Sequence, residues 1–272
     1  MTDKFKGILL CTDLDETLLT TGDKRLTDEN RRAIEYFMSE GGYFTFATGR
    51  VPMGAKLLLD LIKPNVPMIC FNGGAIYDFD ENKILWGKQL DRAAVRVVEY
   101  VEENFPDIGI EVCTDTNLYF CKDNRIGEMH RNHEHLPHLS LDYHNIFVPW
   151  KKVIFLAEAD RMPALSEGLK NSPYASAYQF VQSSENYYEL LPVGVSKGAA
   201  LSELARMLGT SKTIGIGDNH NDMELIENAK IGVAVANAVS ELREAADFIT
   251  VDNNSNAVAS VITQLELGML KF

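Results

Sequence analysis

Short, wholly apolar runs alternate with amphipathic helical segments at both ends of this chain, and this alternation constrains its fold most strongly. Ile8–Leu10 is typical of a strand that is buried on both faces of a parallel sheet. Tyr43–Ala47 and Pro67–Phe71 are the next two strand-like runs, and segments with a helical stripe of apolar side chains separate them. The same rhythm returns later with Thr213–Ile216 and Ile231–Val235. Such βαβ units have right-handed crossovers and predict an α/β fold with a parallel sheet.

Capping residues and apolar stripes mark the predicted helices. Ser196 is expected to cap one helix, and Gly209 is expected to end it. Leu57, Leu58 and Leu61 form an apolar stripe that we expect to be the buried face of another helix.

The pattern changes in the middle of the chain. Ile108–Cys113 and Leu118–Lys122 are strand-like runs joined by a turn, and further runs of this kind follow. Adjacent strands joined by short turns indicate a largely antiparallel α+β unit. We therefore predict one domain made of residues 1–82 and 191–272, with a second domain, residues 83–190, inserted into it.

Composition and charge exclude several classes of partner. With 26 basic and 39 acidic residues among 272, the chain has a net charge of −13, and its pI is near 4.9. An acidic surface repels phosphate backbones and anionic lipids, so we expect neither nucleic acid nor a membrane as a partner. No apolar run approaches the length of about 20 residues that a spanning helix needs. The four cysteines show no CxxC spacing, and Cys11 and Cys70 lie in apolar runs, where a free thiol behaves as a small hydrophobe. We therefore expect a reducing compartment and a cytoplasmic protein.

Two pairs of aspartates follow strands of the predicted parallel sheet. Asp13 and Asp15 come just after the first strand, and Asp218 and Asp222 come just after Thr213–Ile216. Because ligands of open α/β sheets bind at the carboxyl ends of the strands, both pairs lie on the functional edge. If the pairs converge, their mutual repulsion requires a cation, and carboxylate oxygens suit Mg²⁺. Aspartates after strands also form turns and cap helices, so either pair alone has a structural explanation.

Two more groups would suit an anion at this edge of the sheet. Thr48 and Gly49 follow the second strand and offer a hydroxyl and accessible backbone N–H groups. Lys197 lies in the first turn of its predicted helix, where the helix dipole disfavours a cation unless an anion is near. Taken alone, Thr-Gly is more often a simple turn, and a solvated surface position is the structural alternative for Lys197.

These residues form motifs in which the chain resembles the haloacid dehalogenase superfamily, and within it the Cof-type phosphatases. Asp13-Leu-Asp-Glu-Thr17 is similar to the first family motif, Thr48-Gly-Arg50 to the second, Lys197 to the third and Gly217-Asp-Asn-His-Asn-Asp222 to the fourth. The resemblance covers essentially the whole chain. It implies a Rossmann-like parallel-sheet core with an inserted α+β cap domain of type C2. Glu16 stands where most relatives have glycine.

The resemblance also implies a mechanism and a set of site residues. Asp13 would attack phosphorus and form an aspartyl-phosphate, and Asp15 would protonate the leaving alcohol and then deprotonate the attacking water. This chemistry implies a Mg²⁺-dependent phosphatase for small phosphorylated metabolites, sugar phosphates first, with the cap choosing the substrate. The remaining implied roles are phosphate binding by Thr48, Gly49, Lys197 and Asn221, and metal binding by Asp13, the Asp15 main-chain carbonyl, Asp218 and, through water, Asp222.

Two other functions are compatible with the same residues. A sugar phosphomutase would pass the phosphoryl group to a second sugar instead of water. A non-catalytic regulator would bind a phosphorylated metabolite and close its cap as a switch, although the presence of Asp13 and Asp15 favours an enzyme.

The predicted inserted domain contains two further groups of polar residues. A tract of histidines has the residue type that binds zinc, but Pro137 interrupts it and no cysteine joins it, so a surface segment is favoured. Its members are His130, His133, His135 and His138. Four basic residues of this domain are possible anion contacts, for which solvated positions are expected: Lys122, Arg125, Lys151 and Lys152.

Overall fold

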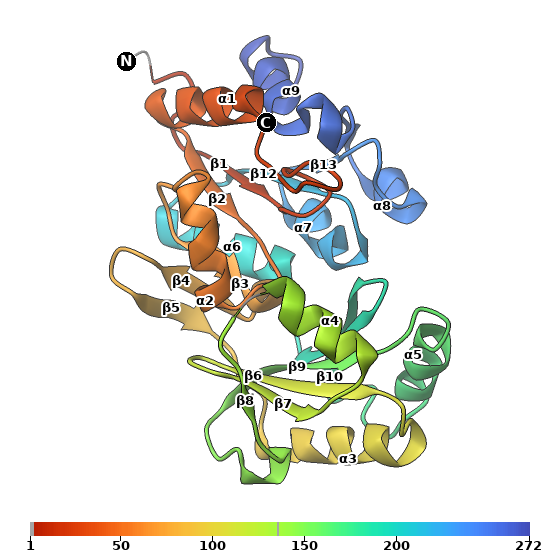
Figure 1. Ribbon diagram of the computed structural model, residues 1–272. Coiled ribbons are helices and arrows are strands. Elements are labelled where there is room, and N and C mark those ends of the chain that lie inside the picture. The colour runs from red at the N-terminus through yellow and green to blue at the C-terminus, as the bar shows by residue number, and fades with distance from the viewer. Residues whose placement is uncertain (1–2, 135) are drawn as a thin grey trace. The chain divides into compact units, whose positions relative to one another are not determined.

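The computed structural model describes residues 3–134 and 136–272, which form two compact units (Figure 1). The first unit contains the described residues up to Gly49, together with Ala55–Gly87 and Ser196–Phe272. The second unit contains Arg50–Gly54 and Lys88–Val195. The N-terminal and C-terminal parts of the chain thus build the same unit, seen in red to orange and in blue in Figure 1.

The unit boundaries differ by a few residues from the predicted domain boundaries at 82/83 and 190/191. The strand β5 (Lys83–Gly87) belongs to the first unit because it pairs with β4 (Ala75–Asp78). At the other junction, β11 (Tyr187–Pro192) belongs to the second unit because both of its neighbouring strands lie there.

In the described part of the first unit, five strands form a parallel sheet in the order β14-β13-β12-β1-β2, as expected from the apolar runs. The first strand is buried along its whole length, which explains its uninterrupted apolar sequence. The strands are β1 (Ile8–Thr12), β2 (Tyr43–Phe46), β12 (Lys212–Gly217), β13 (Ile231–Ala234) and β14 (Phe248–Ile249).

Helices cover this sheet, and the expected capping residues shape one of them. Leu201 and Leu204 of α6 pack with Leu9 of β1 in one buried cluster. The Ser196 side chain accepts a hydrogen bond from the Ala199 N–H at the start of α6, and Gly209 ends the helix at a φ of 68°. Figure 1 shows α1 and α9 side by side. The helices are α1 (Asp28–Ser39), α6 (Lys197–Leu208), α7 (Met223–Asn228), α8 (Ser240–Ala245), α9 (Ala257–Glu266), and the 3₁₀ helices η5 (His220–Asp222) and η6 (Asn253–Ser255).

The third predicted strand does not continue the parallel sheet. This strand, β3 (Met68–Cys70), pairs antiparallel with β4 in a separate sheet of the order β3-β4-β5, and a parallel bridge joins Ala47 to Ile69. The chain reverses directly after β3 in a tight 3₁₀ turn, η2 (Phe71–Gly73). Because this turn returns the chain alongside β3, the strand pairs with β4 along its length.

The helix expected around Leu57 is also different in the structure. A four-residue helix, α2 (Pro52–Ala55), is followed by the 3₁₀ helix η1 (Lys56–Asp60). Leu58 is buried, whereas Leu57 is 56% exposed. The prediction that Leu57 belongs to the core is therefore wrong, because the tighter 3₁₀ turn changes which side chains share a face.

In the described part of the second unit, six strands form a sheet in the order β10-β11-β9-β6-β7-β8. All neighbouring pairs are antiparallel except β7 and β8, so the α+β prediction is confirmed for this sheet. Its strands are β6 (Gly109–Thr114), β7 (Leu118–Lys122), β8 (Leu139–Ser140), β9 (Trp150–Leu156), β10 (Tyr178–Ser184) and β11. Its helices are α3 (Val95–Asn104), α4 (Arg125–Glu134), α5 (Met162–Lys170), η3 (Arg92–Ala94) and η4 (Tyr143–Asn145).

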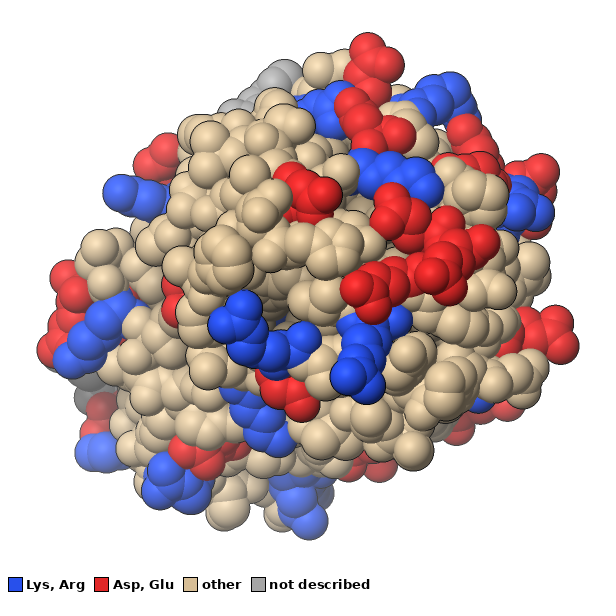
Figure 2. All heavy atoms as spheres, turned by 90° about the horizontal axis from the view of Figure 1, so that it is seen from below, with Lys and Arg blue, Asp and Glu red and all other residues tan. Residues whose placement is uncertain are grey.

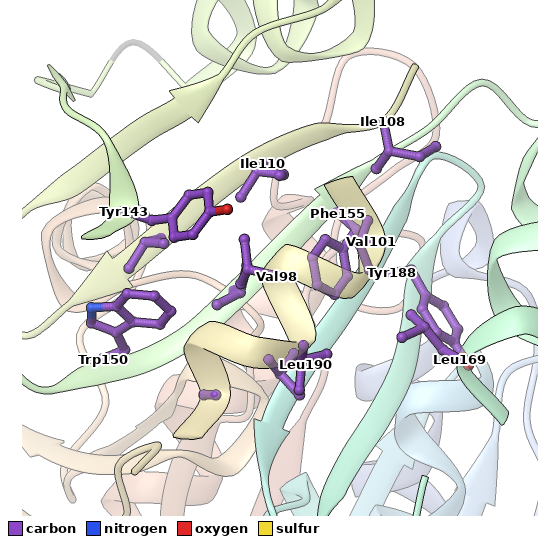
Figure 3. Packing of buried hydrophobic residues seen from close by; sticks show 14 of the residues in the cluster. Val98, Val101, Ile108, Ile110, Tyr143, Trp150, Phe155, Leu169, Tyr188 and Leu190 are labelled. Atoms are coloured by element: carbon purple, nitrogen blue, oxygen red, sulfur yellow. The ribbon is translucent and has the colours of Figure 1, made fainter. Parts of the chain in front are cut away.

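One face of this sheet forms the hydrophobic core of the second unit. Figure 3 shows Val98 and Val101 of α3 against Phe155 of β9 and Leu190 of β11, and Leu169 of α5 belongs to the same cluster. Because alternate residues of a strand point to opposite faces, the neighbours of these apolar residues lie on the other face of the sheet.

That other face carries a buried ion pair. The Lys152 Nζ atom lies 2.9 Å from Glu189 Oε2, and both side chains are almost completely buried. Lys151 is buried as well, and its Nζ atom lies 3.2 Å from Asp115 Oδ1. The expectation of solvated positions for Lys151 and Lys152 is therefore wrong, because the sequence does not show which acidic partners reach them.

Two observations bear on the expected absence of nucleic-acid and membrane partners. None of the helices in residues 3–134 and 136–272 has the length and apolar composition of a membrane span. On the face shown in Figure 2, acidic side chains lie among the basic ones. A phosphate backbone placed on this face would meet carboxylates as well as cations.

Candidate active site

Three carboxylates meet at the carboxyl edge of the parallel sheet. Asp13 follows β1, Asp218 follows β12, and Asp222 ends η5. Each offers one oxygen within 4.8 Å of the others. The two strands are direct neighbours, and the Asp13 N–H donates a hydrogen bond of 2.8 Å to the Ile216 carbonyl, which holds the two strand ends together. The structure therefore brings both predicted aspartate pairs to one edge, with one carboxylate from the first pair and two from the second.

Lys197 bridges two of these carboxylates. Its Nζ atom lies 2.5 Å from Asp13 Oδ1 and 2.6 Å from Asp222 Oδ1, and its side chain is completely buried. Burial acts to lower the pKa of Lys197, but the carboxylates of Asp13 and Asp222 outweigh it, so the pKa is raised above its ordinary value. Lys197 is therefore a charged ammonium at neutral pH and not a solvated surface lysine.

The carboxylates carry more negative charge than Lys197 can balance. Burial raises the pKa of Asp13 well above its usual range, although Lys197 opposes this effect. Burial, and then the charge of Asp222, raise the pKa of Asp218 to about 7. A second cation would relieve this repulsion, and an all-oxygen set of carboxylates fits a hard divalent ion such as Mg²⁺.

Asp222 also has the structural role that a helix-capping residue would have. Its Oδ2 atom accepts hydrogen bonds from the backbone N–H groups of Asp218, at 3.0 Å, and Asn219, at 3.2 Å. Together with the Asn219 side chain this forms a capping box at the start of η5. Asp222 therefore has both roles at once: one carboxylate oxygen caps the helix, and the other forms an ion pair with Lys197.

Asp15 lies outside the group of three carboxylates. Its side chain is about one third exposed, and its Oδ1 atom accepts a hydrogen bond of 2.9 Å from Lys24 Nζ. Lys24 was not among the residues expected from the sequence, where it is one basic residue in a polar loop. An exposed carboxylate beside the site, held by a cation, is well placed to exchange protons with solvent.

Glu16 and Thr17, which follow Asp15 in the sequence, form hydrogen bonds that hold this segment in place. The Thr17 hydroxyl donates a hydrogen bond of 2.7 Å to Asp218 Oδ1 and so orients this carboxylate. Glu16 adopts a left-handed backbone conformation with a φ of 60°. Its carboxylate accepts a hydrogen bond of 2.5 Å from the Thr21 hydroxyl, and its carbonyl accepts one of 2.8 Å from Asn237 Nδ2.

The predicted phosphate-binding residues lie close to one another in the first unit. Thr48 follows β2 and is buried, and its N–H donates a hydrogen bond of 2.9 Å to the Ile69 carbonyl. Asn221, on η5, donates a hydrogen bond of 3.2 Å from Nδ2 to Asn72 Oδ1. Asn72 follows β3 and was not expected at the site. The one sequence feature that could have indicated it is the Asn-Gly turn after the third predicted strand.

The described histidines of the tract belong to no group of three potential metal ligands. His135 lies outside the described residues, and the side chain of His133 is not described. His130 is buried and contacts Tyr187, with 3.0 Å between Nδ1 and the hydroxyl oxygen, so the expectation of a surface segment is wrong for this residue. Among the described residues, the group of three potential ligand side chains is the aspartate group in the first unit.

Comparisons with known proteins show the family to which this chain belongs. The model of the haloacid dehalogenase-like hydrolase family matches residues 10–262. A candidate phosphatase of Streptococcus pyogenes serotype M6, M6_Spy0533, is 30% identical over 96% of this chain and 98% of its own length. The 5-amino-6-(5-phospho-D-ribitylamino)uracil phosphatase YwtE of Bacillus subtilis is 28% identical over 95% of this chain and 98% of its own.

A solved structure shares the fold. The sugar phosphatase BT4131, of haloacid dehalogenase subclass IIB, superimposes with a TM-score of 0.83 and 18% sequence identity, over 97% of this chain and 100% of its own. This similarity agrees with a parallel-sheet domain and an inserted α+β domain.

Proposed function

Because the chain belongs to the haloacid dehalogenase-like hydrolases, we propose that it is a Mg²⁺-dependent phosphatase that forms an aspartyl-phosphate on Asp13. The observation that carries the proposal is the position of Lys197, whose ammonium contacts the carboxylates of both Asp13 and Asp222. This contact would hold the Asp13 carboxylate in place for attack on phosphorus. It also places a permanent positive charge where a phosphoryl group would arrive.

The carboxylates of Asp13 and Asp218 and the main-chain carbonyl of Asp15 would hold the metal ion, and Asp222 would act through water. The ion would supply positive charge that offsets the repulsion between an anionic nucleophile and a phosphate dianion. Its expected ligands come from segments that β1 and β12 place next to each other. The hydroxyl of Thr17 would keep Asp218 turned toward the ion.

The reaction would proceed in two displacements at phosphorus. In the first, an Asp13 oxygen attacks phosphorus, the bond between phosphorus and the leaving oxygen breaks, and Asp15 gives its proton to that oxygen. In the second, Asp15 takes a proton from water, the water oxygen attacks phosphorus, and inorganic phosphate leaves Asp13. Thr48, Gly49 and Asn221 would hold the non-bridging oxygens during both steps.

For the substrate we propose a small phosphate monoester of a polyhydroxylated compound. Sugar phosphates belong to this class, and so does the phosphoribityl compound in the name of the relative YwtE. We further propose that the second unit serves as the cap that selects the leaving group. A screen of phosphate esters that includes both compound types, scored by kcat/KM, would rank them.

The central test is hydrolysis of p-nitrophenyl phosphate with Mg²⁺ and with EDTA. We expect turnover with Mg²⁺, loss of turnover in EDTA, and a loss of about a thousandfold or more in Asp13→Asn. Full activity of Asp13→Asn would remove the nucleophile assignment. Analysis of the products from a sugar phosphate distinguishes a phosphatase, which releases inorganic phosphate, from a phosphomutase, which yields an isomeric ester.

Asp15 has its own test, because general acid catalysis matters most for poor leaving groups. In Asp15→Asn we expect a larger loss of kcat/KM for an alkyl phosphate than for p-nitrophenyl phosphate, by about tenfold or more. Equal losses for both substrates would show that Asp15 does not protonate the leaving group.

A further inference from the structure

The turn after β3 has an unusual backbone. Phe71, Asn72 and Gly73 all have positive φ angles, of 55°, 53° and 96°. A left-handed conformation is unfavourable for a residue with a side chain, and Phe71 adopts it although it is bulky and fully buried. Strained backbone of this kind persists where the surrounding structure holds it, and it is frequent at functional sites.

The turn is held against two segments of the proposed active site. The Asn72 N–H donates a hydrogen bond of 2.9 Å to the Thr48 carbonyl. A Cβ atom placed on Gly49 would lie 3.0 Å from Asn72 Nδ2, so the Asn72 carboxamide packs directly on Gly49. A Cβ atom on Gly73 would lie 2.0 Å from the Ser196 carbonyl oxygen, so the turn also packs on the residue that precedes Lys197.

A third segment of the proposed site reaches the same turn. The Asn221 Nδ2 atom donates a hydrogen bond of 3.2 Å to Asn72 Oδ1, across 149 positions of sequence. Asn72 itself is buried, with an exposed fraction of 2%. The turn therefore contacts the segments that carry Thr48, Lys197 and Asn221, all within the first unit.

We infer that Asn72 is a positioning residue for phosphoryl binding, an inference that rests on the proposed function. A carboxamide nitrogen has two hydrogens, and Asn221 gives one of them to Asn72. This bond sets which end of the Asn221 carboxamide faces the site, and it leaves the second N–H to be donated to a phosphoryl oxygen. Without Asn72, the Asn221 carboxamide can turn its oxygen toward the phosphoryl group, which would repel it.

Asn72 also has a purely structural explanation, since asparagine tolerates the left-handed conformation better than most residues. Asn72→Gly separates the two explanations, because glycine adopts this backbone readily but has no carboxamide. Asn82→Gly is the matched control, since Asn82 also has a positive φ, of 51°, and its Oδ1 atom accepts a hydrogen bond from the Tyr77 hydroxyl in the β4–β5 turn.

The experiment is a double-mutant cycle with Asn72→Gly, Asn221→Ala and the double variant. The measured quantity is the dissociation constant of inorganic phosphate in the presence of Mg²⁺, from calorimetry. We expect each single substitution to weaken binding by about tenfold, and the double variant to bind no more weakly than Asn221→Ala. Asn82→Gly should bind phosphate as the wild type does.

Three outcomes would overturn the inference. They are wild-type affinity in Asn72→Gly, effects that multiply in the double variant, and a wild-type protein that binds no phosphate. If the wild type binds phosphate but hydrolyses no ester, the proposed function fails while the cycle still decides the role of Asn72. If Asn72→Gly does not fold, Asn72→Leu keeps a similar side-chain size but cannot accept the hydrogen bond from Asn221, so wild-type affinity in that variant also overturns the inference.

Discussion

Lys197 and Asp222 form an ion pair with 2.6 Å between Nζ and Oδ1, and neither side chain is exposed to solvent. The same ammonium lies 2.5 Å from Asp13 Oδ1. Transfer of these charges from water into the protein costs free energy. A role in function, rather than a gain in stability, therefore explains why a charged pair is buried here. Asp222 also accepts hydrogen bonds from two backbone N–H groups, so its carboxylate stays in place if the Lys197 side chain moves. Asp222 is thus the fixed partner, and Lys197 is held between it and the proposed nucleophile.

Lys197→Met should destabilise the protein strongly, because it leaves buried carboxylates without their cation. We expect the free energy of unfolding to fall by about 3–5 kcal/mol in EDTA, measured by urea denaturation. Lys6→Met is the control, since Lys6 pairs with Asp3 at the surface, and it should cost less than about 1 kcal/mol. Similar losses for both variants would contradict the assigned role of the buried pair.

The stability of the metal-free protein should depend on Asp218. Its pKa is about 7 in the folded chain, compared with about 3.9 for an unfolded aspartate. Because the unfolded carboxyl loses its proton first as pH rises, this group lowers stability progressively from about pH 4 to about pH 7. Mg²⁺ competes with the proton, so it should raise the melting temperature more at about pH 7.5 than at about pH 5.5.

Melting curves with EDTA and with Mg²⁺ at both pH values test this dependence. Asp218→Asn is the control, since it lacks this titrating carboxyl and should reduce the difference between the two pH values, while Asp13, whose pKa burial also raises, still contributes to it. An equal effect of Mg²⁺ at both pH values in the wild type would contradict the prediction.

Thr17→Val should weaken metal binding while it preserves the shape of the side chain. The variant removes the hydrogen bond of 2.7 Å that orients Asp218, and the loss of such outer contacts typically lowers metal affinity about 10–100-fold. We expect the Mg²⁺ concentration for half-maximal activity to rise by about tenfold or more. Thr17→Ser keeps the hydroxyl and should need the same Mg²⁺ concentration as the wild type. If Thr17→Ser needs as much Mg²⁺ as Thr17→Val, the effect comes from lost packing of the methyl group and not from the hydrogen bond.

Glu16 offers a test of backbone strain beside the site. Because its φ is 60°, glycine should fit the position better than alanine, by about 1 kcal/mol in the free energy of unfolding. Both variants lose the hydrogen bond to Thr21, so the difference between them isolates the backbone contribution. Chemical denaturation of the two variants measures it, and equal stabilities would show that the left-handed conformation carries no such cost here.

Much of the fold could be predicted from local patterns. The apolar run of β1 and the cap at Ser196 depend on neighbouring residues alone, and both were predicted. The pairing of β3 could not be predicted, because a short apolar run does not show on which side its partner strand lies. Leu57 was misplaced for a similar reason, since a stripe of leucines does not distinguish an α-helix from a 3₁₀ turn.

The amino-acid order alone predicts where the candidate site residues lie along the chain. Asp13 and Asp218 each follow an apolar run, and parallel strands must bring their carboxyl ends to one edge. The neighbours that contact these side chains become known from the folded domain: Thr17 for Asp218, Lys24 for Asp15 and Asn72 for Asn221. The physical reason is that such contacts depend on loop conformations and side-chain directions set by the whole packed domain. A repeating pattern of apolar residues carries no information about them.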